Sequence, residues 1–225
     1  MKFRFAYFIF LFVFAAGCEK DQYKYKKFIN NTEIVYAGLA ENLVARSGRL
    51  RVQLEWTKSI DPKVVSYIVY WNNNRDSATI PASATQADGV YRYLISGLPE
   101  YTQAFKIIAV NDRGYRSIGQ DLNGVKIFGP FYNSSLINQK LNSRRYFGTD
   151  SVRLYFGKLD STRIFSKLQY YKNDNTLDSV TFLSDSVTIK SFKLGTKPTV
   201  QSYFKPASTA IDTFKTLQPD SLTAF

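Results

Sequence analysis

One pattern of alternating residues occurs twice in this chain, about 100 residues apart. Val52-Gln-Leu-Glu-Trp56 in the first half has the same pattern as Val152-Arg-Leu-Tyr-Phe156 in the second. With one inserted residue, the segment from Tyr70 to Ile80 also matches the segment from Tyr171 to Phe182. Because two strands and a hairpin recur in the same order, we expect two similar domains.

The repeated segments are typical of β-strands. Leu50, Val52, Leu54 and Trp56 alternate with polar residues, as in a strand with one buried face. Further short runs rich in Val, Ile, Tyr, Phe and Thr are separated by Gly, Pro, Asn and Asp, at intervals typical of a sandwich. Asn72-Asn73-Asn74 tolerates the left-handed backbone that a hairpin needs. The sequence therefore predicts an all-β fold with two tandem immunoglobulin-like sandwiches and no long helix.

The first half also carries residues found at fixed places in one class of sandwich. These are Trp56 in the second strand, Tyr67-x-Val69 in the third, and Ile95-Ser-Gly-Leu-Pro99 before the penultimate strand. On these residues the first half resembles a fibronectin type III domain, and the second half resembles a more diverged one. The tyrosine-corner position of that family falls on Gln103, unless nearby Tyr101 replaces it.

The N-terminus has the features of a secretion signal. Lys2 and Arg4 precede about a dozen apolar residues, a run too short for a membrane span of roughly 20 residues. The end of this run, Ala15-Ala16-Gly17-Cys18, resembles a bacterial lipobox, which implies cleavage before Cys18 and lipidation of its thiol. We expect a signal peptide at 1–17, a lipidated tether at 18–32, and sandwiches at 33–127 and 128–225.

Motifs along the whole chain resemble a family of Bacteroidota lipoproteins of unknown function. The matching pieces are Tyr25-Lys-Lys-Phe-Ile29, Glu33-Ile-Val-Tyr36 with Gly38, Asp61-Pro-Lys63, Tyr70-Trp-Asn-Asn73 and Pro206-Ala-Ser-Thr-Ala-Ile-Asp-Thr-Phe214. The resemblance implies a companion of Sus-type glycan uptake systems in the outer membrane, with Sus-type transporter proteins as partners. Glu19-Lys20-Asp21 after the cysteine is compatible with placement on the cell surface.

Composition argues against most enzyme classes. The chain has no histidine and a single cysteine, so histidine-dependent catalysis, a disulfide within the chain and zinc sites built on His or several Cys are excluded. The acidic residues show no cluster of the kind a glycosidase pair would need. We therefore expect no catalytic residues, no metal and no cofactor. The net charge of +12 favours acidic surfaces, but an exported chain without a run of basic residues is not expected to bind nucleic acid.

Most of the sixteen tyrosines and eighteen phenylalanines are expected in the cores. Four apolar residues lie on the face of their strands that points away from the predicted core: Ile68, Tyr70, Ile108 and Val110. Such a patch often marks an interface for a ligand or a partner. The second domain or the tether could instead cover it, and that alternative is left open here.

Asp-Ser followed by a small or aliphatic residue occurs six times. The motif resembles the acceptor pattern for O-glycosylation of exported Bacteroidota proteins, and it is also common where a chain leaves a turn and enters a strand. The candidate acceptors are Ser77, Ser151, Ser161, Ser179, Ser186 and Ser221.

Together these features predict a non-catalytic lipoprotein of the outer membrane, held by Cys18 and exposed at the cell surface. The first hypothesis for its role is binding of a polysaccharide as an accessory component of a Sus-type uptake system. The alternative is a structural spacer or protein-interaction module that binds no sugar.

Overall fold

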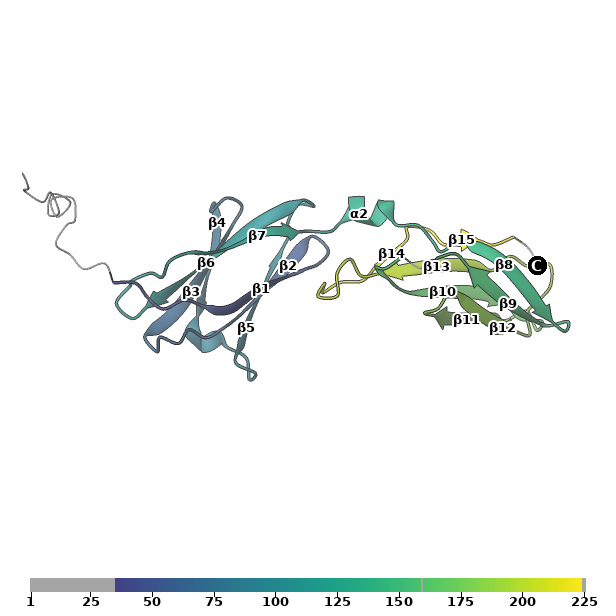
Figure 1. Cartoon of the computed structure of the whole chain (residues 1–225), viewed down its shortest axis with the longest axis horizontal. Helices are drawn as coiled ribbons and strands as arrows, with labels where there is room; N and C mark the ends of the chain where they lie inside the picture. Colours follow the sequence, from purple (N-terminus) through teal and green to yellow (C-terminus); the bar gives the residue numbers. More distant parts are fainter. Residues whose placement is uncertain (1–34, 159, 224–225) are drawn as a thin grey trace, which may run out of the picture. The chain divides into compact units, whose positions relative to one another are not determined.

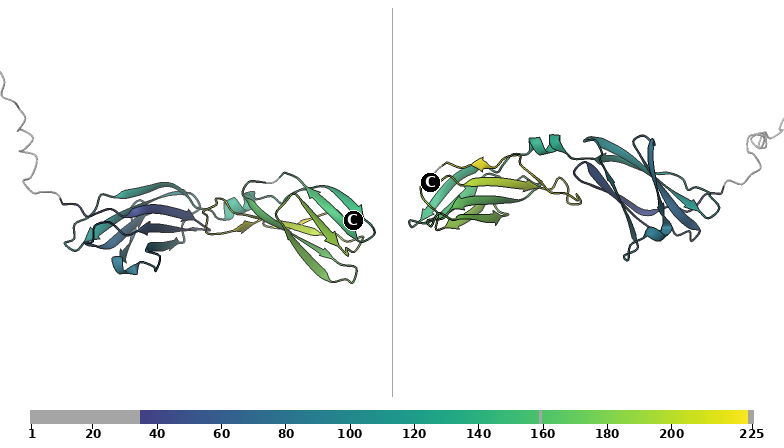
Figure 2. Two further views of the ribbon diagram at one scale, coloured as in Figure 1. Left: turned by 60° about the horizontal axis from the view of Figure 1, so that its bottom comes forward. Right: turned by 180° about the vertical axis from the view of Figure 1, so that it is seen from behind.

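The computed structural model describes residues 35–158 and 160–223, whose regular secondary structure is almost entirely β-strand. The predicted Cys18 anchor and the 18–32 tether lie outside these residues. Figure 1 shows two groups of strands, β1 to β7 and β8 to β15, with the short helix α2 (Pro130–Ser135) between them along the chain. Each group is a pair of antiparallel sheets, and Figure 2 shows these sheets from two further sides. The predicted all-β fold with two tandem sandwiches is therefore confirmed.

The strands of the first sandwich are β1 (Glu41–Ser47), β2 (Arg51–Thr57), β3 (Val64–Trp71), β4 (Asp76–Pro81), β5 (Val90–Ser96), β6 (Thr102–Asn111) and β7 (Gln120–Lys126), with a 3-10 turn at Ala82–Ala84. One sheet has the order β1-β2-β5 and the other β4-β3-β6-β7. The alternating residues Val52, Leu54 and Trp56 are buried, and the core also contains Tyr67, Val69, Phe105 and Ile107. The core is centred on three aromatic rings, since Trp56 stacks on Tyr91 at 5.4 Å between centroids and Tyr67 meets both edge-on. Alternation along the strands thus identified the core.

The second sandwich repeats this topology. Its strands are β8 (Leu141–Phe147), β9 (Ser151–Phe156), β10 (Arg163–Tyr171), β11 (Leu177–Phe182), β12 (Ser186–Lys190), β13 (Thr199–Phe204), β14 (Phe214–Lys215) and β15 (Asp220–Ser221). One sheet has the order β12-β9-β8, and β11-β10-β13 forms the other with β14 and β15 at its edge. Val152, Leu154 and Phe156 are buried like their counterparts Val52, Leu54 and Trp56.

Two details differ from what the sequence predicts. Leu50 lies outside β2 in a left-handed conformation (φ 50°), because its N–H donates to the carbonyl of Phe128 instead of extending the strand ladder. No tyrosine corner is formed by Tyr101, whose side chain is exposed, while Gln103 occupies the buried position. The Nε2 of Gln103 has no hydrogen-bond partner among the described residues.

A loop of the second sandwich contacts the turn between β1 and β2 of the first. This loop, residues 205–213, joins β13 to β14. Asp212 accepts hydrogen bonds from Arg51 through both carboxylate oxygens, at 2.5 and 2.9 Å, and from the backbone N–H of Arg49 at 2.7 Å. The guanidinium of Arg51 lowers the pKa of the Asp212 carboxyl below its usual value. A paired carboxylate therefore links the two sandwiches.

Close backbone approach and a ring cluster complete this junction. The N–H of Ile211 donates to the carbonyl of Ser47 at 2.9 Å. A Cβ on Gly48 would lie 2.4 Å from an oxygen of Asp212 and 2.7 Å from the Ile211 side chain, so a larger residue here would displace these two side chains. The ring of Phe214 meets the ring of Phe128 edge-on at 6.0 Å. The segment Pro206–Phe214, one of the family-like motifs, thus supplies the contacts of the second sandwich to the first.

The second sandwich also holds a buried polar network around the end of the connecting segment. The Oδ1 of Asn138 accepts from the N–H of Ser202 at 2.9 Å and from the hydroxyl of Thr216 at 2.7 Å, and its Nδ2 donates to the carbonyl of Gln218 at 2.8 Å. The hydroxyls of Ser166 and Ser202 lie 2.9 Å apart. These polar groups satisfy one another and anchor the connecting segment in the second sandwich.

Candidate functional site

The apolar patch of the sequence analysis lies on the outer face of the sheet β4-β3-β6-β7. Ile68 of β3 is directly opposite Ile108 of β6, with Tyr70 and Val110 two residues along their strands on the same face. The structure therefore brings these four residues together. Each side chain is half-buried, and none belongs to the buried core of the first sandwich.

Polar neighbours limit this patch. Tyr70 is opposite Lys106 on one side and Ser77 on the other, and Lys106 approaches Asp121 at 3.6 Å. The apolar surface is thus a narrow strip along two strands. This is a modest contact area for a ligand, because polar and charged residues border it.

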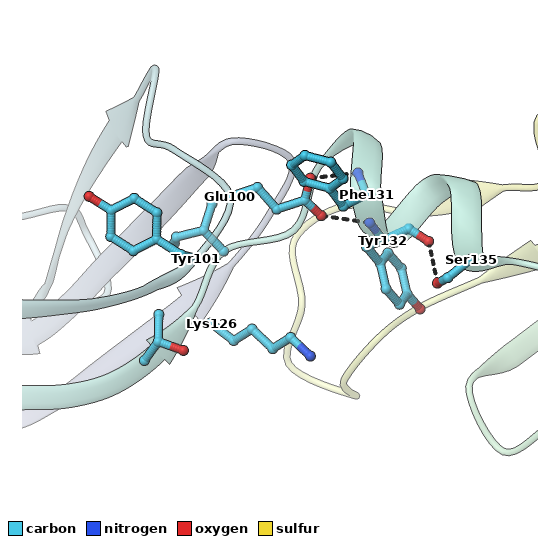
Figure 3. A pocket seen from close by; sticks show the side chains of 8 residues that line it. Glu100, Tyr101, Lys126, Phe131, Tyr132 and Ser135 are labelled. Carbon is cyan, nitrogen blue, oxygen red and sulfur yellow. Dashed lines mark hydrogen bonds between the residues drawn. The ribbon is translucent and has the colours of Figure 1, made fainter.

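A better-formed site lies where α2 meets the end of the first sandwich. It is a cleft of about 390 Å³. The residues that line it are Glu100, Tyr101, Thr102, Lys126, Ile127, Phe131, Tyr132 and Ser135. Figure 3 shows Phe131 beside the carboxylate of Glu100, the Lys126 side chain reaching towards Tyr132, and the ring of Tyr101 turned away from the helix.

Glu100 fixes the position of the helix in this cleft. Its carboxylate accepts hydrogen bonds from the backbone N–H groups of Phe131 at 2.7 Å and Tyr132 at 2.6 Å. These N–H groups have no partner within a helix, so the carboxylate caps the first turn that begins at Pro130. The helix in turn holds the ring of Phe131 in solvent, with 80% of its surface exposed.

The ring of Tyr132 lines the cleft and packs on two other rings. It packs edge-on against Phe128 at 4.8 Å and Phe214 at 5.0 Å. Burial raises the pKa of the Tyr132 phenol, so this residue stays neutral at physiological pH. The ammonium of Lys126 lies 5.5 Å from the centre of the Phe128 ring.

The cleft thus combines an exposed aromatic ring, a cation, a carboxylate and hydroxyl groups. An exposed ring can stack on the apolar face of a sugar, and the polar groups beside it can bind hydroxyls. Sequence reasoning missed this site. The available signal was Pro130 at the start of a short helix, followed directly by an aromatic residue, after the strand that ends at Lys126.

The Asp-Ser motifs are distributed over both sandwiches. Ser77, Ser161, Ser179 and Ser221 are exposed, whereas Ser151 and Ser186 are half-buried. Five of the motifs begin or directly precede a strand, at Ser77 of β4, Ser151 of β9, Ser161 before β10, Ser186 of β12 and Ser221 of β15. Such positions suit a turn-to-strand role as well as modification.

Two general features of the described residues bear on function. Among residues 35–158 and 160–223, no helix has the length and apolar character needed to cross a bilayer. Over the same residues, no three potential metal-ligating Asp, Glu, Cys or His side chains lie together.

Solved structures with similar folds contain fibronectin type III domains. One is the crystal structure of chicken CNTN1 FN1-FN3 domains, with 13% identity, a TM-score of 0.42, and coverage of 85% of this chain and 68% of that one. Another is a two-domain fibronectin type III segment from chicken tenascin, with 12% identity, a TM-score of 0.33, and coverage of 81% and 96%. No curated protein matches the chain.

The family comparison covers most of the sequence. Residues 18–214 match the DUF4998 family, which is described as a domain of unknown function. The match covers the first sandwich and the second as far as the start of β14, including the segment Pro206–Phe214. This chain therefore belongs to the DUF4998 family.

Proposed function

We propose that this protein is a non-catalytic lipoprotein of the outer membrane that binds a polysaccharide at the cell surface, as an accessory component of a Sus-type uptake system. The observation that carries the proposal is the cleft beside α2. There, the exposed ring of Phe131 lies beside the carboxylate of Glu100, and Lys126 and Ser135 also line the cleft. This combination suits stacking and hydrogen bonding to a sugar.

The membrane anchor is the second part of the proposal. It rests on the lipobox-like segment that ends at Cys18, and the family match also begins at that residue. A Cys18→Ala protein should leave the membrane fraction and keep its fold. In intact cells, added protease should cut the native protein; if the protein stays whole while known surface lipoproteins are cut, the surface placement is wrong.

The rival function is a spacer or protein-interaction module. The contacts of Asp212 with Arg51 and Arg49 favour it, since they join the two sandwiches. Such a role needs no sugar. It predicts that a membrane partner co-purifies with the protein and that no glycan retards it.

Affinity electrophoresis of the mature protein carrying Cys18→Ser, in gels containing a panel of neutral polysaccharides, tests glycan binding. We expect retardation by at least one of them. Phe131→Ala should reduce that affinity by about fivefold, because loss of one stacked ring is worth on the order of 1 kcal/mol. Tyr70→Ala should leave it unchanged if the cleft, and not the apolar patch, is the site.

Tyr115→Ala is the matched control for the cleft, because this exposed tyrosine lies in the segment between β6 and β7 and does not line the cleft. Thermal unfolding of each variant checks that the fold is retained. Absence of retardation across the panel would reject glycan binding. Loss of retardation in Tyr70→Ala alone would move the site to the apolar patch.

A further inference from the structure

The outer face of the sheet β12-β9-β8 in the second sandwich is basic and contains no carboxylate. Cross-strand pairing places nine side chains on it in three rows. The rows are Thr188, Arg153 and Arg145; Lys190, Ser151 and Phe147; and Ser186, Tyr155 and Ser143. Three cations, two aromatic rings and four Ser or Thr side chains therefore share one face, which we call the basic-aromatic face.

Its two arginines are directly opposite each other. Arg145 of β8 pairs with Arg153 of β9, and like charges in that position repel. Neither has a carboxylate partner among the described residues. Arg153 donates to the hydroxyl of Ser186 at 3.1 Å and lies over the ring of Tyr155, and Arg145 lies over the ring of Phe147. Both guanidinium groups keep exposed N–H donors.

On the equivalent face of the first sandwich, a carboxylate neutralises the arginines. There, Arg46 of β1 pairs across the strands with Gln53, as Arg145 pairs with Arg153. Glu55 stands at the position of Tyr155 in the repeat and forms ion pairs with Arg46 at 2.7 Å and Arg92 at 3.5 Å. The second sandwich has lost that central carboxylate and gained a cation and a ring.

We infer that the basic-aromatic face binds an acidic polysaccharide, one that carries carboxylate or sulfate groups. Arginine donors bind such anions with charge-assisted hydrogen bonds. The rings of Phe147, with 45% of its surface exposed, and Tyr155 offer stacking surfaces for sugars between the charges. The hydroxyl groups suit a ligand that is itself rich in hydroxyls.

The composition of the face disfavours the other anionic partners. A membrane-binding surface gains affinity from apolar side chains that enter the lipid, and the rings here are the only apolar groups among nine residues. Single-stranded nucleic acid would also stack on rings beside cations. An exported chain would not meet nucleic acid. The preference for a polysaccharide over nucleic acid therefore rests on the export assumed in the proposed function.

The test is affinity electrophoresis of the mature protein carrying Cys18→Ser with polygalacturonate and dextran sulfate as acidic probes and dextran as the neutral one. We expect retardation by at least one acidic probe, which weakens as salt is raised because exposed charges are screened. Arg145→Gln combined with Arg153→Gln should weaken it at least about tenfold, since two charge-assisted bonds are lost. Tyr155→Glu, which restores the carboxylate of the first sandwich, should do the same.

Arg46→Gln is the matched control, because it removes an arginine from the equivalent place in the first sandwich. It should leave acidic binding unchanged, as should Phe131→Ala in the cleft beside α2. Neutral-glycan binding lost in Phe131→Ala but retained in the arginine variants would separate the two surfaces. The two surfaces are tested with different probes. If no neutral glycan binds the cleft, binding of an acidic polysaccharide to the basic-aromatic face is still tested separately.

Several results would overturn the inference. One is no retardation by either acidic probe, and another is equal retardation of the wild type and the double arginine variant. Binding to polyglutamate, to anionic phospholipid vesicles or to single-stranded DNA that is as tight as to the acidic polysaccharides would show that charge alone is recognised. The face must also be free of sugar, so O-glycosylation of Ser151 or Ser186 found by peptide mass mapping in the native protein would contradict it.

Discussion

The two sandwiches share their strand order but differ on their outer faces. In the first, Glu55 holds Arg46 and Arg92 in ion pairs. In the second, Tyr155 takes the place of that glutamate and Arg153 faces Arg145. Inward positions kept their apolar character because packing requires it, as Val152 and Leu154 match Val52 and Leu54. In a repeated domain, the outward positions are therefore free to differ in chemistry, and these differences indicate where the functions of the two copies differ.

The interiors differ as well. The first core is centred on stacked aromatic rings, with Trp56 fully buried between Tyr67 and Tyr91. The second sandwich adds a polar network around Asn138 to a smaller apolar core. A buried network contributes to stability only while every member has its partner. The second sandwich should therefore be the more sensitive to a single polar substitution.

Asn138→Ala tests this sensitivity and has the largest expected effect. It leaves the N–H of Ser202, the hydroxyl of Thr216 and the carbonyl of Gln218 without the partner they have in the native protein. Ser202 and Thr216 are buried, and each buried group left unpaired costs about 1–3 kcal/mol, so we expect the free energy of unfolding to fall by about 2–6 kcal/mol. Urea unfolding followed by circular dichroism measures it.

Asn142→Ala is the control for this change, because Asn142 is exposed on β8. Its effect should stay within about 0.5 kcal/mol. If Asn138→Ala costs no more than the control, water replaces the lost partners and the polar network is not what distinguishes the second sandwich.

Asp212→Asn addresses the contact that joins the two sandwiches. The pair with Arg51 is bidentate but partly exposed to solvent, so we expect a loss of about 1 kcal/mol at pH 7. The hydrogen bonds from Arg51 lower the pKa of Asp212 in the folded protein, so the pair stabilises the fold above the unfolded value of about 3.9. That stabilisation is lost as pH falls through the lowered folded pKa.

Urea unfolding of wild type and Asp212→Asn from pH 7 down to acid pH measures the difference between them. The difference should shrink below about pH 4 and vanish once Asp212 is protonated in the folded protein. Asp185→Asn serves as a control, since its carboxylate makes no hydrogen bond among the described residues. A difference between wild type and Asp212→Asn that does not change with pH would show that the charge of Asp212 does not stabilise the junction.

The sequence was sufficient for the cores and for the repeat, because both depend on local alternation. Val52, Leu54 and Trp56 point inward as their spacing predicts, and Asn72 to Asn74 adopt the left-handed backbone expected of their hairpin. The junction could not be predicted in the same way. Arg51 and Asp212 are 161 residues apart, and no periodicity records a contact at that separation.

The candidate sites show the same division. The patch around Ile68 and Tyr70 was found because an apolar residue on an outward position breaks the alternation. The cleft beside α2 does not disturb the alternation of polar and apolar residues, because Phe131 lies outside any strand. The basic-aromatic face does not disturb it either, because Arg153 is polar at a position where a polar residue is expected. A signal for the basic-aromatic face was present in the repeat. Comparing Glu55 with Tyr155 would have exposed the change of charge between the two halves.

Glu55→Tyr makes that change in the first sandwich and has the smallest expected effect on stability. Loss of the pairs with Arg46 and Arg92 should cost less than about 1 kcal/mol, as is usual for ion pairs near the surface.

In a background of Arg145→Gln and Arg153→Gln, the variant should regain part of the retardation by polygalacturonate or dextran sulfate. The gain should be partial, because Arg92 still pairs with Asp88 at 2.6 Å and Gln53 supplies no second opposing cation. Affinity electrophoresis compares this triple variant with the double arginine variant. Equal mobility of the two would mean that removing the carboxylate is not enough, and that the cation at position 153 is what distinguishes the second sandwich from the first.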